Sequence, residues 1–394
     1  MPLRFRRPSQ CFALAAGSLL LSCKAADRSH ETAAPPALQA TARIADTGGG
    51  PAYEFTSIAQ VLERNDSVFV RQQGIQEIRV FDTSGIHLGT IGRAGGGPGE
   101  FRSLEAMGFV GDTLWSIDGD LRRLSFFSPN GTLLVTLPYE PVSPAIGDGV
   151  QFFFPYFKAL LDDGSVLGFG GSAARDIASG KVAASPLLRM ARSGATHDTL
   201  GWVPIGNAHM IMRSERRTMY RVQPYNDAPL TIYGPEARRV YIVHRPAAAR
   251  ADSEHVTVTA LTATGDTAFV TRVGYLPEVL DRTKVDSLRA AYHKAHAGIF
   301  PPADVDRALY VPAFRPPITG GIAATDGALW LRWDDDTRSG LVTVIDPDGR
   351  TQHTLSIVPG AKLLWASTDA MWAEVRDEND VPTLVRYQIT SRGS

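Results

Sequence analysis

The chain has 394 residues, and its 40 Lys and Arg against 41 Asp and Glu give a formal net charge of −1. This length allows one or two domains with a large core. The near-zero charge provides no basic field that would attract nucleic acid, so we expect no nucleic-acid partner. The 37 Gly and 26 Pro, with plentiful aromatic and β-branched residues, favour many short strands joined by turns.

The N-terminus reads as a targeting segment. Arg4, Arg6 and Arg7 precede an apolar stretch, residues 11–22, which at 12 residues is too short to span a bilayer. Residues 20–23, Leu-Leu-Ser-Cys, resemble the lipobox of bacterial lipoproteins. The resemblance implies a signal peptide over 1–22, a lipid on Cys23 and a place in the cell envelope, facing the periplasm or the surface at the outer membrane. The alternative is an ordinary secretory signal and a secreted protein.

Residues 23–39 are rich in Ala, Pro, Ser and charge, so we expect them to form a flexible tether for the lipid anchor. Past the N-terminus there is no run of 18 apolar residues, and the lipid is therefore the only membrane contact that we expect. Both cysteines, Cys11 and Cys23, lie at or before the cleavage point. We therefore expect neither a disulfide nor a cysteine metal site in the mature domain.

One short pattern occurs six times: a turn-forming pair, one further residue, an apolar residue and then an aromatic or large apolar one. The copies end in Val68-Phe69, Leu114-Trp115, Val166-Leu167, Val240-Tyr241, Leu329-Trp330 and Met371-Trp372. Turn pairs such as Asn-Asp and Asp-Gly supply the backbone angles of a tight turn before a strand. Six such units predict an all-β fold, a six-bladed β-propeller over residues 40–394.

The first two units each predict four antiparallel strands. The ranges are 55–61, 67–71, 78–81 and 87–91, followed by 106–110, 113–117, 124–127 and 133–137. Later third strands are expected at 187–191, 256–261, 341–345 and 384–387. The sixth unit lacks a fourth strand, while residues 40–44 are strand-like and have no unit of their own. We therefore predict that 40–44 pairs with 384–389 and closes the ring, which also protects a sheet edge. The alternative is a disordered N-terminal segment.

The link between the first two units resembles a known family. Residues 91–101 read Ile-Gly-Arg-Ala-Gly-Gly-Gly-Pro-Gly-Glu-Phe and follow Val80-Phe81-Asp82 and a turn at Gly85. Such links resemble those of bacterial six-bladed β-propellers related to NHL-repeat propellers. The resemblance implies the fold and an envelope location, but no settled activity. The link is not a phosphate loop, because it lacks Gly-Lys-Ser/Thr and runs into a strand rather than a helix.

The spacing of the repeat places two insertions. Phe69 and Trp115 are 46 residues apart, whereas Leu167 to Tyr241 is 74 and Tyr241 to Trp330 is 89. The additions, about 203–228 and 276–317, both lie between a fourth strand and the next inner strand. These links open on the same face as the loops between second and third strands, which we call the insertion face. We expect a partial lid there, with one helix capped by Thr283 and Asp286 and ended at Gly298.

Charged residues gather on the predicted insertion face and form our candidate binding surface. They are Arg93, Glu100, Arg102, Asp118, Asp120, Arg213, Arg216, Arg217, Arg221, Asp334, Asp335, Asp336, Arg376 and Asp377. Acidic loops can supply oxygen ligands to Ca²⁺, and His293 and His296 share one face of the expected helix. However, no run has the spacing of a calcium loop and no His-Glu-x-x-His is present. We therefore assign no metal, cofactor or catalytic residue.

Two functions remain. The leading hypothesis is a lipid-anchored binding or scaffold module, which holds an unknown protein or small-molecule ligand at the insertion face. The alternative is a metal-dependent propeller hydrolase or lyase with its site at the central channel. That enzyme needs at least three Asp, Glu, Asn or His side chains converging on the channel. Residues 318–324, Ile-Thr-Gly-Gly-Ile-Ala-Ala, predict a small, apolar channel wall instead and favour binding.

Overall fold

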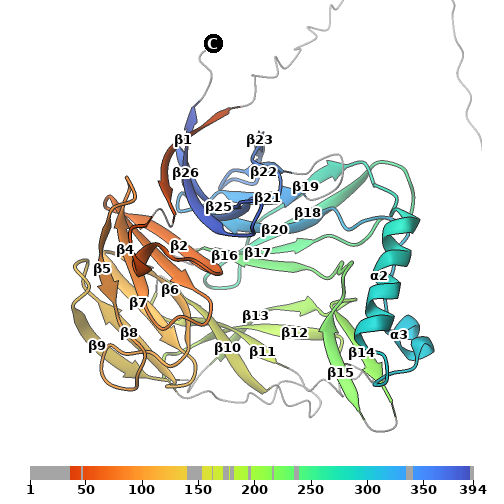
Figure 1. Ribbon diagram of the computed structural model, residues 1–394, viewed down its shortest axis with the longest axis horizontal. Coiled ribbons are helices and arrows are strands. Elements are labelled where there is room, and N and C mark those ends of the chain that lie inside the picture. The colour runs from red at the N-terminus through yellow and green to blue at the C-terminus, as the bar shows by residue number, and fades with distance from the viewer. Residues whose placement is uncertain are drawn as a thin grey trace, which may run out of the picture. The chain divides into compact units, whose positions relative to one another are not determined.

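The structure is a computed structural model that describes residues 36–45, 48–139, 153–161, 163–171, 177, 182–193, 197–214, 217–234, 239–333 and 340–390. Six four-stranded antiparallel sheets surround a central space (Figure 1), which confirms the six-bladed propeller. Blade one contains β2 (Ile58–Arg64), β3 (Ser67–Gln72), β4 (Ile78–Asp82) and β5 (His87–Ile91). Blade two contains β6 (Leu104–Val110), β7 (Thr113–Asp118), β8 (Arg123–Phe127) and β9 (Leu133–Pro138).

The remaining blades follow the same order from the inner to the outer strand. Blade three contains β10 (Phe153–Leu160), β11 (Val166–Gly171), β12 (Ala184–Met190) and β13 (His197–Pro204). Blade four contains β16 (Leu230–Tyr233), β17 (Arg239–His244), β18 (Glu254–Thr262) and β19 (Thr267–Tyr275). Blade five contains β20 (Ile318–Ala323), β21 (Leu329–Trp333), β22 (Leu341–Ile345) and β23 (Thr351–Ser356). Blade six contains β24 (Lys362–Ala366), β25 (Ala370–Arg376), β26 (Pro382–Thr390) and, from the start of the chain, β1 (Ala37–Ile44).

The N-terminal strand closes the ring as predicted. β1 pairs antiparallel with β26, from Ala37 opposite Thr390 to Ile44 opposite Leu384. It begins three residues before the expected start, inside the segment that we took as tether, and Ile44 is fully buried. The signal peptide, Cys23 and most of the tether lie outside the described residues.

The repeated turn pairs produce the tight turns that the pattern predicted. Between β2 and β3, Asn65 and Asp66 have φ of 48° and 59°, the left-handed geometry of a two-residue hairpin turn. The inner strand β2 begins at Ile58 rather than at residue 55. Residues before it are used otherwise: η1 (Pro51–Tyr53) is a short 3₁₀ helix, and the Thr56 amide donates to the side-chain oxygen of Gln72 at 2.8 Å.

The repeat tryptophans pack between blades. Trp115, Trp330 and Trp372 are all at most 2% exposed and lie in three different apolar clusters of the ring. This agrees with their interpretation as core rather than as a cofactor cage. No helix among the described residues is long and apolar enough to cross a bilayer.

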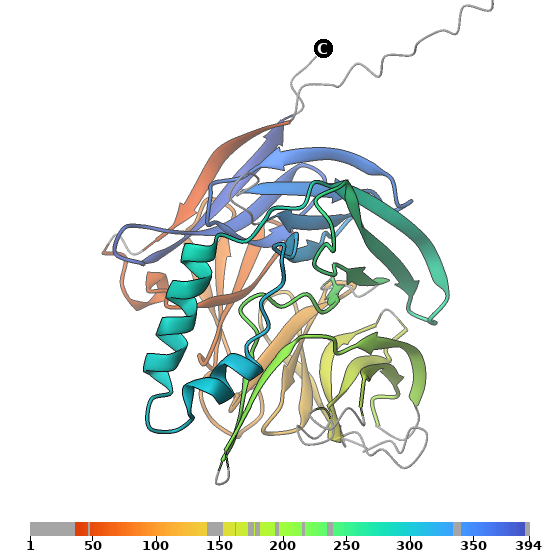
Figure 2. The ribbon, with the colours of Figure 1, turned by 90° about the vertical axis from the view of Figure 1, so that its right-hand side faces the viewer.

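The two insertions pack against each other and form one unit, which we call the insertion module. The first supplies the hairpin β14 (His209–Arg213) and β15 (Thr218–Val222), and the second supplies α2 (Arg282–Ala295) and α3 (Pro302–Ala308). Their common core contains Met210 and Met212 from the hairpin and Phe300, Val305 and Leu309 from the helical segment. Figure 2 shows the hairpin and both helices in front of the ring of blades.

A buried glutamine ties the insertion module together. The Gln223 side chain donates to the Ala308 carbonyl at 2.8 Å and accepts from the Tyr310 amide at 3.0 Å. The helix expected in the second insertion is α2, but its cap is Asp281, whose carboxylate accepts from the Thr283 amide at 2.8 Å. The capping box of Thr283 and Asp286 was therefore wrong by two residues. The seven-residue helix α3 was not predicted, because it is too short to show a periodic apolar stripe.

Candidate functional site

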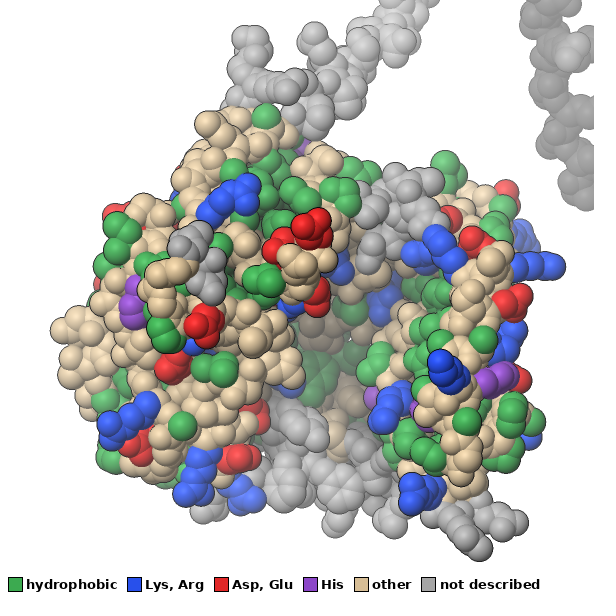
Figure 3. Space-filling model, viewed as in Figure 1, with side chains coloured by type: hydrophobic (Ala, Val, Ile, Leu, Met, Phe, Trp, Pro, Cys, Tyr) green, Lys and Arg blue, Asp and Glu red, His purple; other side chains and the backbone are tan. Residues whose placement is uncertain are grey.

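A cavity of about 330 Å³ lies in the central channel, and the inner strands of all six blades line it. Figure 3 shows the molecule hollowed between the blades on the left and α2 on the right. The volume is at the lower end of the roughly 300–1,000 Å³ typical of small-molecule sites. A molecule of modest size therefore fits between the six sheets.

β-bulges shape the wall of this cavity. β2, β6, β20 and β24 each skip one residue in the pairing with the second strand, and β10 skips a residue at two places. The skipped residues that line the cavity are Ala59, Glu105, Lys158 and Leu364. A bulge bends the strand and re-aims the side chain of the extra residue. Two charged side chains, those of Glu105 and Lys158, thus enter the channel from positions that simple alternation would not assign to it.

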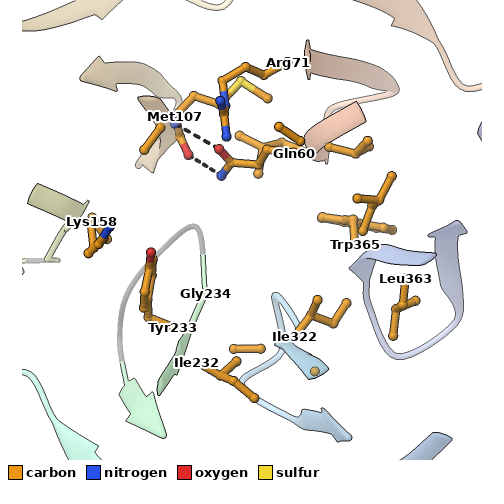
Figure 4. Close-up of a pocket in the computed structure, with 18 of the residues that line it drawn as sticks. Gln60, Arg71, Met107, Lys158, Ile232, Tyr233, Gly234, Ile322, Leu363 and Trp365 are labelled. Carbon is orange, nitrogen blue, oxygen red and sulfur yellow. Dashed lines mark hydrogen bonds between the residues drawn. The ribbon is translucent and has the colours of Figure 1, made fainter. Parts of the chain in front are cut away.

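One side of the cavity is polar. Figure 4 shows the polar ends of Arg71, Lys158 and Tyr233 turned towards a common space, although they come from blades one, three and four. Glu105 and Lys362 also belong to the wall. Three basic side chains therefore face one acidic side chain among the described residues of the wall.

Burial disfavours the charges of the two deeper basic groups. Arg71 donates to the Leu104 carbonyl at 3.1 Å, but its Nε is buried and has no hydrogen-bond partner within the described part of the chain. Burial lowers the pKa of Arg71, and the charge of Glu105 opposes part of that change. Burial also lowers the pKa of Lys158, again against the effect of Glu105. An anion between these groups would relieve the cost of holding them charged in a poorly hydrated channel.

The remaining titratable groups complete the polar side. Burial raises the pKa of Tyr233 to about 12, with a smaller opposing effect of Arg71, so its hydroxyl stays protonated at neutral pH. Burial raises the pKa of Glu105, while Lys158 lowers it. The Glu105 side chain is nevertheless exposed to solvent, which screens these effects. The Lys362 ammonium donates to the Ile58 carbonyl at 2.6 Å, across the contact between blades six and one.

Gln60 braces the wall rather than facing a ligand. Its side chain donates to the Met107 carbonyl at 2.6 Å and accepts from the Met107 amide at 3.1 Å, so it joins β2 to β6 as a further peptide group would (Figure 4). With these bonds made, the Gln60 amide is engaged between blades one and two. This contact fixes the distance between two inner strands that carry the polar side of the cavity.

The opposite side of the cavity is apolar. Ile322, Leu363 and Trp365 lie together there in Figure 4, with Ile232 at the lower edge. The expectation of a small, apolar channel wall is correct for β20, which contributes Gly321 and Ile322. It is wrong for β6, β10 and β24, which contribute Glu105, Lys158 and Lys362. No pattern along the sequence marks these three, because each belongs to a different blade.

The described residues offer no set of ligands for a metal ion at the channel. They contain no group of three His, Cys, Asp or Glu side chains that could hold a metal ion. Among the described residues, the channel wall contains three basic groups, those of Arg71, Lys158 and Lys362, and the single carboxylate of Glu105. Their positive charge opposes binding of a divalent cation, so the wall suits an anion better.

Several candidate residues of the insertion face have structural roles in their loops. Glu100 accepts from the Gly97 amide at 2.7 Å and pairs with Arg93 at 2.7 Å, which holds the glycine-rich link in place. Arg123, which the sequence did not single out, donates to three carbonyls of the same link. The buried carboxylate of Asp118 accepts from the amides of Arg102 and Leu121 and so caps its loop.

Blade six uses its candidates in a similar way. Asp377 accepts from the amides of Asn379 and Val381, both at 2.9 Å, and Arg376 pairs with Glu374 at 2.7 Å. Arg102 and Asp120 are exposed. Asp334, Asp335, Asp336 and Arg216 lie outside the described residues.

The basic candidates on the hairpin point to solvent. Arg213, Arg217 and Arg221 are exposed near or within β14 and β15, away from the channel wall. The two helix histidines have ordinary partners: His293 contacts Asp306 at 2.9 Å, and buried His296 stacks on Tyr292. None of the described candidates belongs to the wall of the channel cavity, whereas Arg71, Lys158 and Tyr233 do.

No protein-family model matches the chain, and a search of curated proteins also finds no match. Similar solved structures include an exported protein, described as putative, from Bacteroides fragilis (13% identity, 91% of this chain, 97% of that chain, TM-score 0.44). Virginiamycin B lyase from Staphylococcus aureus (10%, 90%, 99%, 0.41) and a gluconolactonase from Xanthomonas campestris (11%, 91%, 95%, 0.39) are also similar. At these identities and TM-scores the likeness carries no argument about function, and the relation to NHL-repeat propellers stays a prediction.

Proposed function

We propose that this propeller is a binding module of the cell envelope and that its ligand occupies the central channel, entering from the insertion face. The observation that carries the proposal is the cavity of about 330 Å³ with basic groups and a tyrosine hydroxyl on one side and apolar side chains on the other. Concave sites with a few convergent polar groups on a mostly apolar wall are the usual form of small-molecule sites.

The insertion module has its own place in this proposal. It forms one side of the hollow in Figure 3 and carries the exposed residues Arg213, Arg217 and Arg221. A protein partner that binds the propeller only when the ligand is present would contact this module and its basic hairpin. The lipid on Cys23 would hold the propeller at the outer membrane, as its N-terminal sequence predicts.

Capture of the full-length, lipidated protein from its native membranes tests the proposal. Bound small molecules are released and identified by mass spectrometry. The Thr231→Phe variant fills the cavity wall and should lose them, whereas Thr267→Phe, an exposed position on the outer strand of the same blade, should retain them.

A second variant separates the channel from the insertion face. Charge reversal of Arg213, Arg217 and Arg221 to Glu leaves the cavity wall unchanged, so the bound small molecules should remain. If they are instead lost with the charge reversal and retained in Thr231→Phe, the ligand binds at the insertion face and the channel proposal is wrong.

A further inference from the structure

We propose that the ligand of the channel is a small organic carboxylate whose apolar body packs on the blade-five and blade-six side of the cavity. This inference rests on the proposed function and adds the chemical class of the ligand. It follows from the division of the wall into two sides and from the imbalance of its charges.

The charge balance gives the sign of the ligand. Arg71, Lys158 and Lys362 contribute three basic groups to the wall, against the single carboxylate of Glu105. The Nε of Arg71 is buried and has no hydrogen-bond partner within the described residues. A bound anion reduces the repulsion between the basic groups of the wall.

The donors around the space favour a carboxylate. An arginine fork, an ammonium and a neutral phenol hydroxyl come from Arg71, Lys158 and Tyr233, and Figure 4 shows all three aimed at one space. Arg pairs well with a planar carboxylate because its N–H groups are fixed in one plane. The protonated Tyr233 hydroxyl can donate a third bond from blade four.

The apolar side distinguishes an organic anion from an inorganic one. Ile322 and Leu363 offer no hydrogen-bonding group to inorganic phosphate, but together with the Trp365 ring they can pack against an aromatic ring or a short acyl chain. The cavity volume of about 330 Å³ limits the ligand to a small molecule. The β-bulges that present Glu105 and Lys158 support a built site, since bulges commonly re-aim side chains beside functional sites.

Matched probes of one shape test the charge. Benzoate, benzamide and benzylamine are titrated into the folded propeller by calorimetry, with inorganic phosphate as the anion without an apolar body. We expect benzoate to bind about ten-fold or more tightly than benzamide and benzylamine, and raised salt to weaken benzoate alone. Phosphate should bind more weakly than benzoate.

Variants assign the effect to the channel. Arg71→Gln should weaken benzoate about ten-fold and leave benzamide unchanged, while Arg250→Gln, an exposed arginine outside the cavity wall, should change neither. Lys158→Met is a second test that does not touch the Arg71 bond to Leu104, and it should act in the same direction.

The outcomes separate this inference from the function beneath it. If benzamide binds as well as benzoate and Thr231→Phe abolishes both, the channel is the site but the ligand is not an anion. If phosphate binds as tightly as benzoate, the apolar side plays no part and the inference is wrong. If no probe binds with a Kd below about 10 mM, both the inference and the channel function fail.

Discussion

The contact between blades six and one, which we call the seam, differs in kind from the insertion module. At the seam, Arg386 of β26 makes two hydrogen bonds of 2.9 Å to the carboxylate of Glu63 in β2, and the Trp372 indole donates to the same carboxylate at 2.5 Å. These partners are more than 300 residues apart in the chain. The insertion module instead has a small apolar core of its own, with Met210, Met212 and Val305 at its centre.

The two regions differ in how much the stability of the whole ring depends on them. The seam joins the two ends of the chain, so every blade depends on it for closure. The insertion module is formed by the links that precede blades four and five. It can therefore unfold locally while the ring of blades stays closed. We therefore expect changes at the seam to lower global stability and changes in the module to act locally.

The largest effect is expected from removal of β1. Without residues 36–44, β26 becomes an unpaired edge and the buried side chain of Ile44 is lost. We expect a loss of more than about 5 kcal/mol, a large share of the roughly 5–15 kcal/mol typical of a folded domain. Chemical denaturation measures it. Deletion of residues 24–35, which retains β1, is the control, and equal destabilisation by both deletions would contradict the closure.

The next largest loss of stability is expected at the polar contacts of the seam, where Glu63 binds Arg386 and Trp372. Glu63→Gln removes the charge that Arg386 and Trp372 share, in a pair whose side chains are only 13% and 17% exposed. We expect a loss of about 2–3 kcal/mol, because the Arg386 charge stays half-buried without its partner. Glu378→Gln, in an exposed loop, should have no effect. A double-mutant cycle with Arg386→Met should show coupling between the two positions. If there is no coupling, the contact between Glu63 and Arg386 does not stabilise the seam.

One substitution made in both regions tests the comparison itself. Met371 in blade six and Met212 in the module are both fully buried, and Met→Ala at either should cost about 2–3 kcal/mol where the side chain packs. Met371→Ala should lower the global unfolding midpoint. Met212→Ala should instead speed hydrogen exchange in β14, β15 and α3 and leave that midpoint unchanged. If both shift the midpoint equally, the module is part of the ring's cooperative unit.

The smallest effect concerns the channel. Burial lowers the pKa of Lys158, so the unfolded chain binds more protons and stability should rise as pH increases from the folded pKa towards the ordinary value of 10.5. Lys158→Met should remove this rise and stabilise the protein by less than about 1 kcal/mol at neutral pH. Lys294→Met, on the exposed face of α2, is the control. Destabilisation by Lys158→Met at neutral pH would mean that the ammonium supports the fold.

The sequence predicted the blades well because each blade is a local unit. Turn residues such as Asn65 and Asp66 mark where paired strands meet. The absence of a fourth strand in the sixth unit predicted that β1 closes the ring. The channel was harder to predict. Glu105, Lys158 and Lys362 come from separate blades, and bulges aim two of them, so neither spacing nor alternation reveals that they meet. The candidate binding surface was predicted from charged residues expected to be exposed. In the structure, Glu100, Asp118 and Asp377 accept hydrogen bonds from backbone amides and stabilise their own loops.

Titration of benzoate into two variants, followed by tryptophan fluorescence, tests the channel site most directly, since Trp365 lies in the cavity wall. Thr231→Phe fills the cavity from blade four, and Thr267→Phe places the same side chain on an exposed position of that blade. We predict that Thr231→Phe abolishes the benzoate-dependent signal and that Thr267→Phe retains the wild-type affinity. Equal binding by both variants would contradict the channel as the ligand site.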